Sequence, residues 1–458
     1  MNLREKLRNK FLRDMATLQV GSVLTSAGNF VGTVALAFLL GPREQGRYYV
    51  AIALYSLLWL LMNQGFVGAT VSQVAAANAR GLAEKGAAWL AYLGKAYLAL
   101  GLVLAPLGFL LLPPAAKLFG AGEEPALWAF WLTLTPFLEM PRVVVCAALQ
   151  GTRRMLPFAQ IENAHEIARV FLLVAGVLVS GTAAGAILGT LCASGLSSVI
   201  AIEMYLLARR EDPRGLPSFG EMIRLSRIVP LRAGFALGAR LGAVRSIDAL
   251  AREVLPALLA MRFGSSEWVS YLRIAQRILG MPLILMQGAS RTALPMLSEL
   301  AGLKDLAKLR DIYWRASLYS GAFISSGLLL GMLVLPLVLR LFFPTSYHDP
   351  VWQLCWILLP GYAIVSFSIA NDTFYLVSDT LKAGVILSAV GLAVCAVVQT
   401  ILASRLPQTG AAWGLSFTLA VTSMHFAYAA WWFRHRGPRG GAAGGPDRPM
   451  VPSAANPS

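Results

Sequence analysis

Charged residues are scarce in this sequence: 14% of its 458 residues are charged, against about 25% in soluble domains. Apolar residues make up 57% of the chain. Stretches of about 20 mostly apolar residues, long enough to cross a bilayer core, recur from Met15 to Phe433. The alternative, a large soluble protein with fully buried helices, does not account for so many long apolar stretches. The sequence therefore predicts an all-α, polytopic membrane protein.

Cysteine is also rare, with four residues in the whole chain. All four lie inside apolar stretches, so we interpret them as small residues that face lipid or neighbouring helices. Their spacing indicates neither a metal site nor a disulfide framework, and no cofactor is expected. The N-terminal segment has no small-residue cleavage site after a short apolar core, so we do not interpret it as a secretory signal.

The apolar stretches predict twelve membrane spans. These are Met15–Leu40, Tyr48–Val74, Ala88–Leu112, Ala126–Leu149, Phe158–Ser180, Ala183–Leu207, Leu231–Met261, Trp268–Ser290, Ala316–Leu341, Trp352–Val377, Leu381–Ala403 and Ala411–Phe433. Prolines inside several of them predict kinks, which a membrane protein tolerates where neighbouring helices supply partners for the freed carbonyls.

The loops between these spans are basic on one side. With the N-terminus placed in the cytoplasm, the inner loops and tails hold 25 lysines and arginines, and the outer loops hold six. Basic loops face the cytoplasm, so we expect a bacterial inner-membrane protein with both termini cytoplasmic. The same loops face anionic lipid headgroups, which accounts for a pI of about 10.0 without a nucleic-acid partner.

The two halves of the chain resemble each other. Three short patterns recur in the same order, at offsets of 223, 224 and 229 residues. They are Gly-x-x-Glu-x-x-x-Tyr from Gly41 and Gly264, the prolines Pro136 and Pro360, and Gly-x-x-x-Gly from Gly181 and Gly410. Six spans in each half make both halves enter from the cytoplasm, as in parallel repeats.

The repeat predicts two parallel six-helix bundles around a central cavity, the plan of an alternating-access carrier. The predicted units are an N-terminal six-helix bundle at 1–207, a cytoplasmic linker loop at 208–230, a C-terminal six-helix bundle at 231–436 and a disordered cytoplasmic tail at 437–458.

Eight lysines and arginines fall inside predicted spans, where a charge usually faces a wet cavity or a partner. Arg273 and Arg277 lie one turn apart with no acid within four residues, and the preceding span presents Arg245, Asp248 and Arg252 on one face. Arginine's planar fork matches phosphate oxygens, so this basic stripe favours an anion such as a diphosphate. Salt bridges that only hold the bundle together are the alternative. The residues expected to bind the anion are Arg142, Arg240, Arg245, Arg252, Arg273 and Arg277.

Five ordered blocks of sequence resemble one known family. They are Leu40–Tyr49 (LGPREQGRYY), Gln64–Phe66 (QGF), Ala148–Arg154 (ALQGTRR), Arg291–Ser298 (RTALPMLS) and Thr409–Gly414 (TGAAWG). Over about residues 10–435, the set resembles the bacterial polysaccharide-transport family. These are the lipid-linked oligosaccharide, or O-antigen, flippases of the multidrug/oligosaccharidyl-lipid/polysaccharide exporter superfamily. The chain departs from the family pattern at Val269, where glycine is common, and in the deep charges Arg252 and Glu253.

The resemblance implies that the chain moves an undecaprenyl-diphosphate-linked glycan unit from the cytoplasmic to the outer leaflet by alternating access. The arginines would hold the diphosphate, the saccharide would occupy the cleft, and the lipid tail would stay in the bilayer. A polysaccharide polymerase and export machinery would be partners.

Other polar residues inside the spans are weaker candidates. Asn29, Asn63 and Gln64 are candidates for hydrogen bonds to sugar, although such residues more often cross-link helices. The candidates for coupling to a cation are Asp248, Asp372 and Glu139.

Three other classes of function compete with the flippase prediction. A drug or metabolite antiporter of the same superfamily would carry small cations, which favour an acidic cavity. A membrane-embedded polysaccharide polymerase or ligase needs a sizeable outer loop, but the longest predicted ones are only Pro113–Pro125 and Phe342–Val351. A major-facilitator carrier usually has Gly-x-x-x-Asp-basic after its second span, and Val74–Gly86 contains no aspartate. The sequence thus predicts a transporter and not an enzyme.

Overall fold

Helices make up nearly all of the described part of the chain, which contains no strand. The computed structural model describes residues 3–60, 65–212, 216–283, 306–368, 371, 374–375, 378 and 380–436. The prediction of an all-α, polytopic membrane protein is confirmed.

The first helix is a hairpin of two helices. α1 runs from Leu3 to Leu60, but Gly41 inside it has φ 67° and ψ 176°, a conformation that glycine adopts readily. Gln45 Nε2 donates to the carbonyl oxygen of Thr33 at 3.1 Å, although twelve residues span about 18 Å along a straight helix. The chain therefore reverses at Gly41, where the first Gly-x-x-Glu-x-x-x-Tyr pattern predicts a hairpin.

Six further helices complete the N-terminal half. They are α2 (Phe66–Ala79), α3 (Ala83–Leu118), α4 (Glu123–Leu132), α5 (Thr135–Gly151), α6 (Met155–Ser180) and α7 (Ala183–Glu211). α6 ends at Gly181 in the left-handed conformation, and α7 folds back along it. Gly176 and Gly185 make this approach close, since a Cβ on either would lie 2.1 Å from the other's carbonyl oxygen.

The C-terminal half begins with three successive helical segments, α9 (Arg232–Ala249), the π-helix η1 (Leu250–Val254) and α10 (Leu255–Phe263). Residues 266–283 form the next helix. The later elements are α12 (Leu306–Phe342), η2 (Thr345–Tyr347), α13 (His348–Val365), η3 (Ser366–Ser368), α15 (Leu381–Arg405), α16 (Gly410–Val421) and α17 (Ser423–Arg436).

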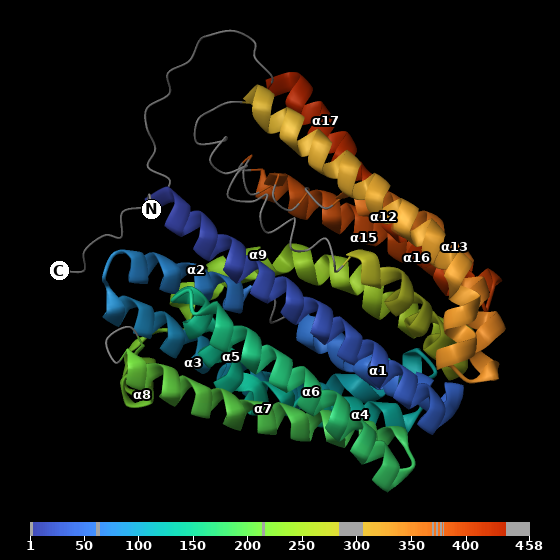
Figure 1. The fold of residues 1–458 in the computed structure, drawn as a ribbon. Helices are drawn as coiled ribbons and strands as arrows, with labels where there is room; N and C mark the ends of the chain where they lie inside the picture. The colour runs from blue at the N-terminus through green and yellow to red at the C-terminus, as the bar shows by residue number, and fades with distance from the viewer. Residues whose placement is uncertain are drawn as a thin grey trace.

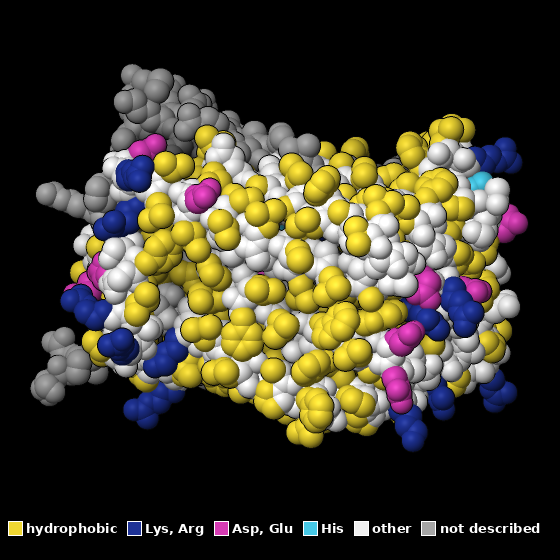
Figure 2. Space-filling view, turned by 90° about the horizontal axis from the view of Figure 1, so that it is seen from below, with side chains coloured by type: hydrophobic (Ala, Val, Ile, Leu, Met, Phe, Trp, Pro, Cys, Tyr) yellow, Lys and Arg dark blue, Asp and Glu magenta, His cyan; other side chains and the backbone are white. Residues whose placement is uncertain are grey.

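Eight helical stretches of the described residues are long and apolar enough to cross a membrane. Figure 2 shows apolar side chains over the middle of one face, with basic and acidic side chains gathered toward its two ends. Large apolar residues such as Phe171 and Leu333 are exposed, as expected for helices whose solvent is lipid. The helices α9, η1 and α10 are not among the eight stretches, and three of their charged residues, Asp248, Arg252 and Glu253, line the cavity described below.

Three segments predicted as loops contain helix, and one of them, Phe342–Val351, includes η2 and the start of α13. In the outer loop predicted at Pro113–Pro125, α3 continues to Leu118 and α4 begins at Glu123. The packing of Leu112 and Ala116 in the core holds this last turn of α3 despite its two prolines.

The linker predicted at 208–230 contains α8 (Phe219–Ile228). Ser218 caps this helix by accepting from the Glu221 backbone N–H at 3.0 Å. Met222 and Leu225 bury its apolar side, so the segment is a short helix docked against the N-terminal half.

The two halves meet tightly at the end that carries the hairpin turns. A Cβ on Gly46 would lie 1.7 Å from the carbonyl oxygen of Ser266, so the two repeated hairpin patterns pack directly against each other. Gln45 beside this contact is fully buried, and its Oε1 accepts from Ser270 at 2.7 Å and from Tyr347 at 2.9 Å. This end of the molecule is therefore closed.

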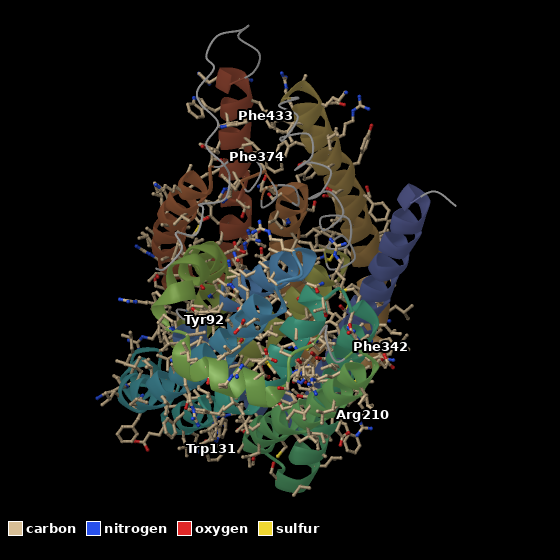
Figure 3. All side chains as sticks on the ribbon, turned by 90° about the vertical axis from the view of Figure 1, so that its left-hand side faces the viewer. Tyr92, Trp131, Arg210, Phe342, Phe374 and Phe433 are labelled. Carbon is tan, nitrogen blue, oxygen red and sulfur yellow. The ribbon has the colours of Figure 1, made fainter. Side chains whose placement is uncertain are left out.

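The halves diverge away from this end. In Figure 1, α12, α15 and α17 run apart from the N-terminal half toward the end where the N-terminus lies. Phe374 and Phe433, whose ring centroids are 5.5 Å apart, lie on this separated arm in Figure 3, far from Tyr92 and Trp131 of the N-terminal half. α2 and α9 remain in contact along one side, because a Cβ on Gly65 would lie 1.6 Å from the carbonyl oxygen of Gly238.

We expect Gly46→Ala to prevent this close approach, because its methyl group meets the backbone of Ser266 and not a movable side chain. The thermal unfolding midpoint of the purified protein in detergent should fall by several degrees. Gly68→Ala is the matched control, since no atom lies within 4 Å of its Cβ position. A Gly46→Ala protein as stable as the Gly68→Ala protein would contradict the close contact.

Candidate functional site

A cavity of about 870 Å³ lies between the two halves. α1 and α6 form the wall from the N-terminal half, and α9, η1, residues 266–283, α13 and α16 form the wall from the C-terminal half. Polar and charged side chains from both walls line it, which is the kind of environment that an intramembrane charge requires.

Pro256 explains the irregular helix on the C-terminal wall. Proline has no backbone N–H, so carbonyls about one turn before it lack their usual helical donor. Two glutamines from other helices replace that donor: Gln276 Nε2 donates to the Arg252 carbonyl at 2.9 Å, and Gln399 Nε2 donates to the Ala251 carbonyl at 3.0 Å. The widened turn at Leu250–Val254 is thereby bonded to the helix at 266–283 through Gln276.

Arg273 and Arg277 lie one turn apart and both line the cavity. Arg273 Nη1 donates to Gln276 Oε1 at 3.2 Å, so Gln276 links this guanidinium to the η1 turn. In the part of the chain that the structure describes, neither arginine has a carboxylate within ion-pair distance. Their positive charges are therefore open to an anion in the cavity.

Arg277 also crosses to the opposite wall. Its Nη1 donates to the Asn29 carbonyl at 3.1 Å and to Thr33 Oγ1 at 2.9 Å. Its guanidinium lies over the Tyr49 ring, 5.8 Å from the centroid. Asn29 Oδ1 accepts from Arg277 at 3.3 Å and from Arg169 at 2.6 Å. One cavity arginine thus holds the two halves together just inside the closed end.

Arg252 is paired with an acid, unlike the other two arginines of the cavity. Its Nε lies 2.7 Å from Asp248 Oδ1, and its Nη2 donates to Thr422 at 2.9 Å. The described lining holds three arginines and three carboxylates, the latter from Asp248, Glu253 and Glu162. The lining is therefore mixed in charge, whereas the sequence predicted a basic stripe.

The other predicted arginine lies behind the cavity wall. Arg142 is not among the lining residues; it bonds Glu139 at 3.2 Å and Glu162 at 2.6 Å. Glu139 also accepts from Ser194 at 3.0 Å, so it is held in a buried network and does not face the cavity. Arg142 and Glu139 instead brace α5, α6 and α7.

Several predicted site residues lie outside the described residues. This holds for Asn63, Gln64 and Asp372, and for the side chains of Arg240 and Arg245. Among the described residues, no group of three or more histidine, cysteine, aspartate or glutamate side chains is placed to hold a metal ion.

Gln276 and Asn163 line the cavity and Thr33 bonds Arg277, although none of the three is predicted from the sequence. Gln276 follows Arg273 by three residues, and that helical spacing was a usable signal. The contact of Thr33 with Arg277 joins residues 244 positions apart, so no pattern of neighbouring residues predicts it.

Asn29 was predicted to bind sugar, but its side chain is engaged within the protein. Its Oδ1 accepts from two arginines and its Nδ2 donates to the Thr25 carbonyl at 3.0 Å. Asn29→Ala should therefore destabilise the protein by about 1–3 kcal/mol, because Arg169 and Arg277 each lose one hydrogen-bond acceptor, although Arg169 keeps Glu166 and Arg277 keeps Thr33. Chemical unfolding would measure this loss, with Asn78→Ala, an exposed site, as the control. Unchanged stability would argue against the structural role.

Comparisons with known proteins agree on the fold. A family model described as "Polysaccharide biosynthesis protein" matches residues 11–301. An inward-facing multidrug resistance MATE transporter of the MOP superfamily is similar at 15% identity, over 92% of this chain and 95% of that chain, with a TM-score of 0.63. A MOP superfamily transporter from Pyrococcus furiosus, described by a binding pocket of reverse polarity, is similar at 16% identity, over 92% and 95%, with a TM-score of 0.59.

No curated protein matches the sequence. At these identities the similar structures show the fold alone, and the family match covers well over half of the chain. The chain belongs to the polysaccharide biosynthesis protein family, and it has the fold of the MOP-superfamily transporters.

Proposed function

We propose that this protein is a transporter that flips a polyprenyl-diphosphate-linked oligosaccharide from the cytoplasmic to the outer leaflet of the bacterial inner membrane. The observation that carries the proposal is the pair Arg273 and Arg277, which line the cavity without a carboxylate partner among the described residues. Two guanidinium groups one turn apart suit the oxygens of a diphosphate, which accept paired N–H donors.

The balance of charge supports an anion at this position. Arg252 is neutralised by Asp248 at 2.7 Å, and Arg142 lies between Glu139 and Glu162. The two lining arginines without a carboxylate at ion-pair distance among the described residues are therefore Arg273 and Arg277. A charge inside a membrane protein is costly unless a partner meets it, and a diphosphate meets both.

The shape of the cavity supports entry of the substrate headgroup from one side of the membrane. Its lining includes Gly21 of α1 and Phe158 of α6, which lie toward the cytoplasm in the orientation predicted from loop charge. The opposite end is closed by Gly46 and Gln45. A headgroup would enter from the cytoplasmic side while its apolar tail remained in lipid. Machinery that polymerises and exports the glycan would act on the product.

A second candidate is export of a small cation, as in a drug antiporter. Glu253 and Glu162 favour it, because both place carboxylates on the cavity wall. Substitution of Arg273 and Arg277 separates the two candidates. Loss of these arginines should reduce transport of a diphosphate lipid but not transport of a cation.

Arg273→Gln and Arg277→Gln should each reduce flipping of a polyprenyl-diphosphate oligosaccharide by about tenfold or more, since a lost charged hydrogen bond costs roughly 1.5–3 kcal/mol. Leaflet accessibility of a labelled substrate in reconstituted vesicles measures the rate. Arg405→Gln is the control, since Arg405 is exposed and lies at the far end of α15.

Wild-type vesicles that export small cations and leave the lipid in place would overturn the flippase proposal. Normal flipping by both arginine variants would overturn the diphosphate assignment.

The proposed orientation is testable by cysteine labelling in a Cys192→Ser background, since the other three native cysteines are buried. A cysteine at Glu123, at the start of α4, should react with a membrane-impermeant maleimide added outside intact cells. A cysteine at Arg80, at the end of α2, should react only after the membrane is opened. The reverse pattern would invert the topology.

A further inference from the structure

α6 carries a second set of binding groups on the wall opposite the arginines. Phe158, Glu162 and Asn163 all line the cavity. Phe158 and Glu162 are four residues apart and so share one face of the helix, and Asn163 is next to them. An aromatic ring, a carboxylate and an amide are thus grouped on the N-terminal wall.

The side-chain carbonyl of Asn163 lacks a hydrogen-bond donor among the described residues. Its Oδ1 is buried and has no hydrogen-bond partner. Gly21 of α1 faces it, and a Cβ at that glycine would lie 3.5 Å from this oxygen. A buried acceptor without a donor is unfavourable until a ligand or water supplies one.

Glu162 is fixed in place yet still accessible. Its Oε1 accepts from Arg142 at 2.6 Å and from Cys146 at 3.4 Å. Its side chain remains 40% exposed, and no described residue donates to its Oε2. The pairing with Arg142 holds the carboxylate rigidly, and the second oxygen is left to accept from a ligand.

These groups match the chemistry of a sugar. Sugar hydroxyls donate to carboxylate and amide oxygens, and the apolar face of a pyranose ring packs against an aromatic ring such as Phe158. The predicted sugar ligand Asn29 has its amide oxygen and nitrogen occupied within the protein, so it is a poorer candidate than this face of α6.

We propose that Phe158, Glu162 and Asn163 form the saccharide subsite of the cavity. The lipid-linked glycan then lies across the interface of the two halves, with its first sugar against α6 and its diphosphate against Arg273 and Arg277. This inference rests on the proposed function and adds to it the group that recognises the sugar.

The test is equilibrium binding of two probes to the purified full-length protein in detergent: undecaprenyl diphosphate, and undecaprenyl diphosphate carrying one N-acetylglucosamine. Wild type should bind the sugar-bearing probe about tenfold more tightly, the change expected from a few added contacts. Phe158→Ala and Asn163→Ala should remove this preference and leave the affinity for undecaprenyl diphosphate unchanged. Arg273→Gln should weaken both probes equally.

Phe171→Ala is the matched control, because Phe171 is on the same helix, is 70% exposed and does not line the cavity. It should retain the preference. Equal binding of both probes by wild type, or a preference retained by both α6 variants, would overturn the subsite and leave the flippase proposal intact. Failure of wild type to bind either probe would overturn the proposed function itself.

Discussion

The contact between the two hairpin turns is the constraint on which the rest of the structure depends. Gly46 lets the α1 hairpin approach the backbone at Ser266, and buried Gln45 then bonds Ser270 and Tyr347 of the other half. With the halves joined at one end, their divergence toward the other end opens a cavity between them. The position of that cavity follows from which end is closed.

Charge in the cavity is tolerated because each charged group has either a partner or access to the cavity. Arg252 is paired with Asp248, and Arg169 is paired with Glu166 and bonded to Asn29. Arg273 and Arg277 are held by neutral acceptors instead. Neutral acceptors orient a guanidinium without cancelling its charge, which is what a site for an anion requires.

Features that depend on residues close together in the sequence could be predicted. The long apolar stretches predicted the helices, and the glycine pattern predicted the hairpin at Gly41. The lack of acids within four residues predicted Arg273 and Arg277 as site residues. The contacts that define the site are long-range. Arg142 bonds Glu162 twenty residues away, and Gln276 reaches the carbonyl that Pro256 frees on another helix. Helical periodicity carries no information on such pairs, so Asp248 was predicted as a site residue but Glu162 and Glu253 were not.

Arg277 connects the proposed substrate site to the closure of the molecule. Arg277 lines the cavity, and its Nη1 donates to the Asn29 carbonyl and to Thr33 of the opposite half. A phosphate oxygen that accepts a hydrogen bond from this nitrogen competes with the Asn29 carbonyl and with Thr33. Binding of substrate and closure of the hairpin end therefore depend on the same guanidinium group. A ligand shifts a conformational equilibrium only by its difference in affinity for the two states. Under the proposed function, substrate in the cavity would favour release of this cross-half contact, and an empty cavity would favour the closed arrangement seen here.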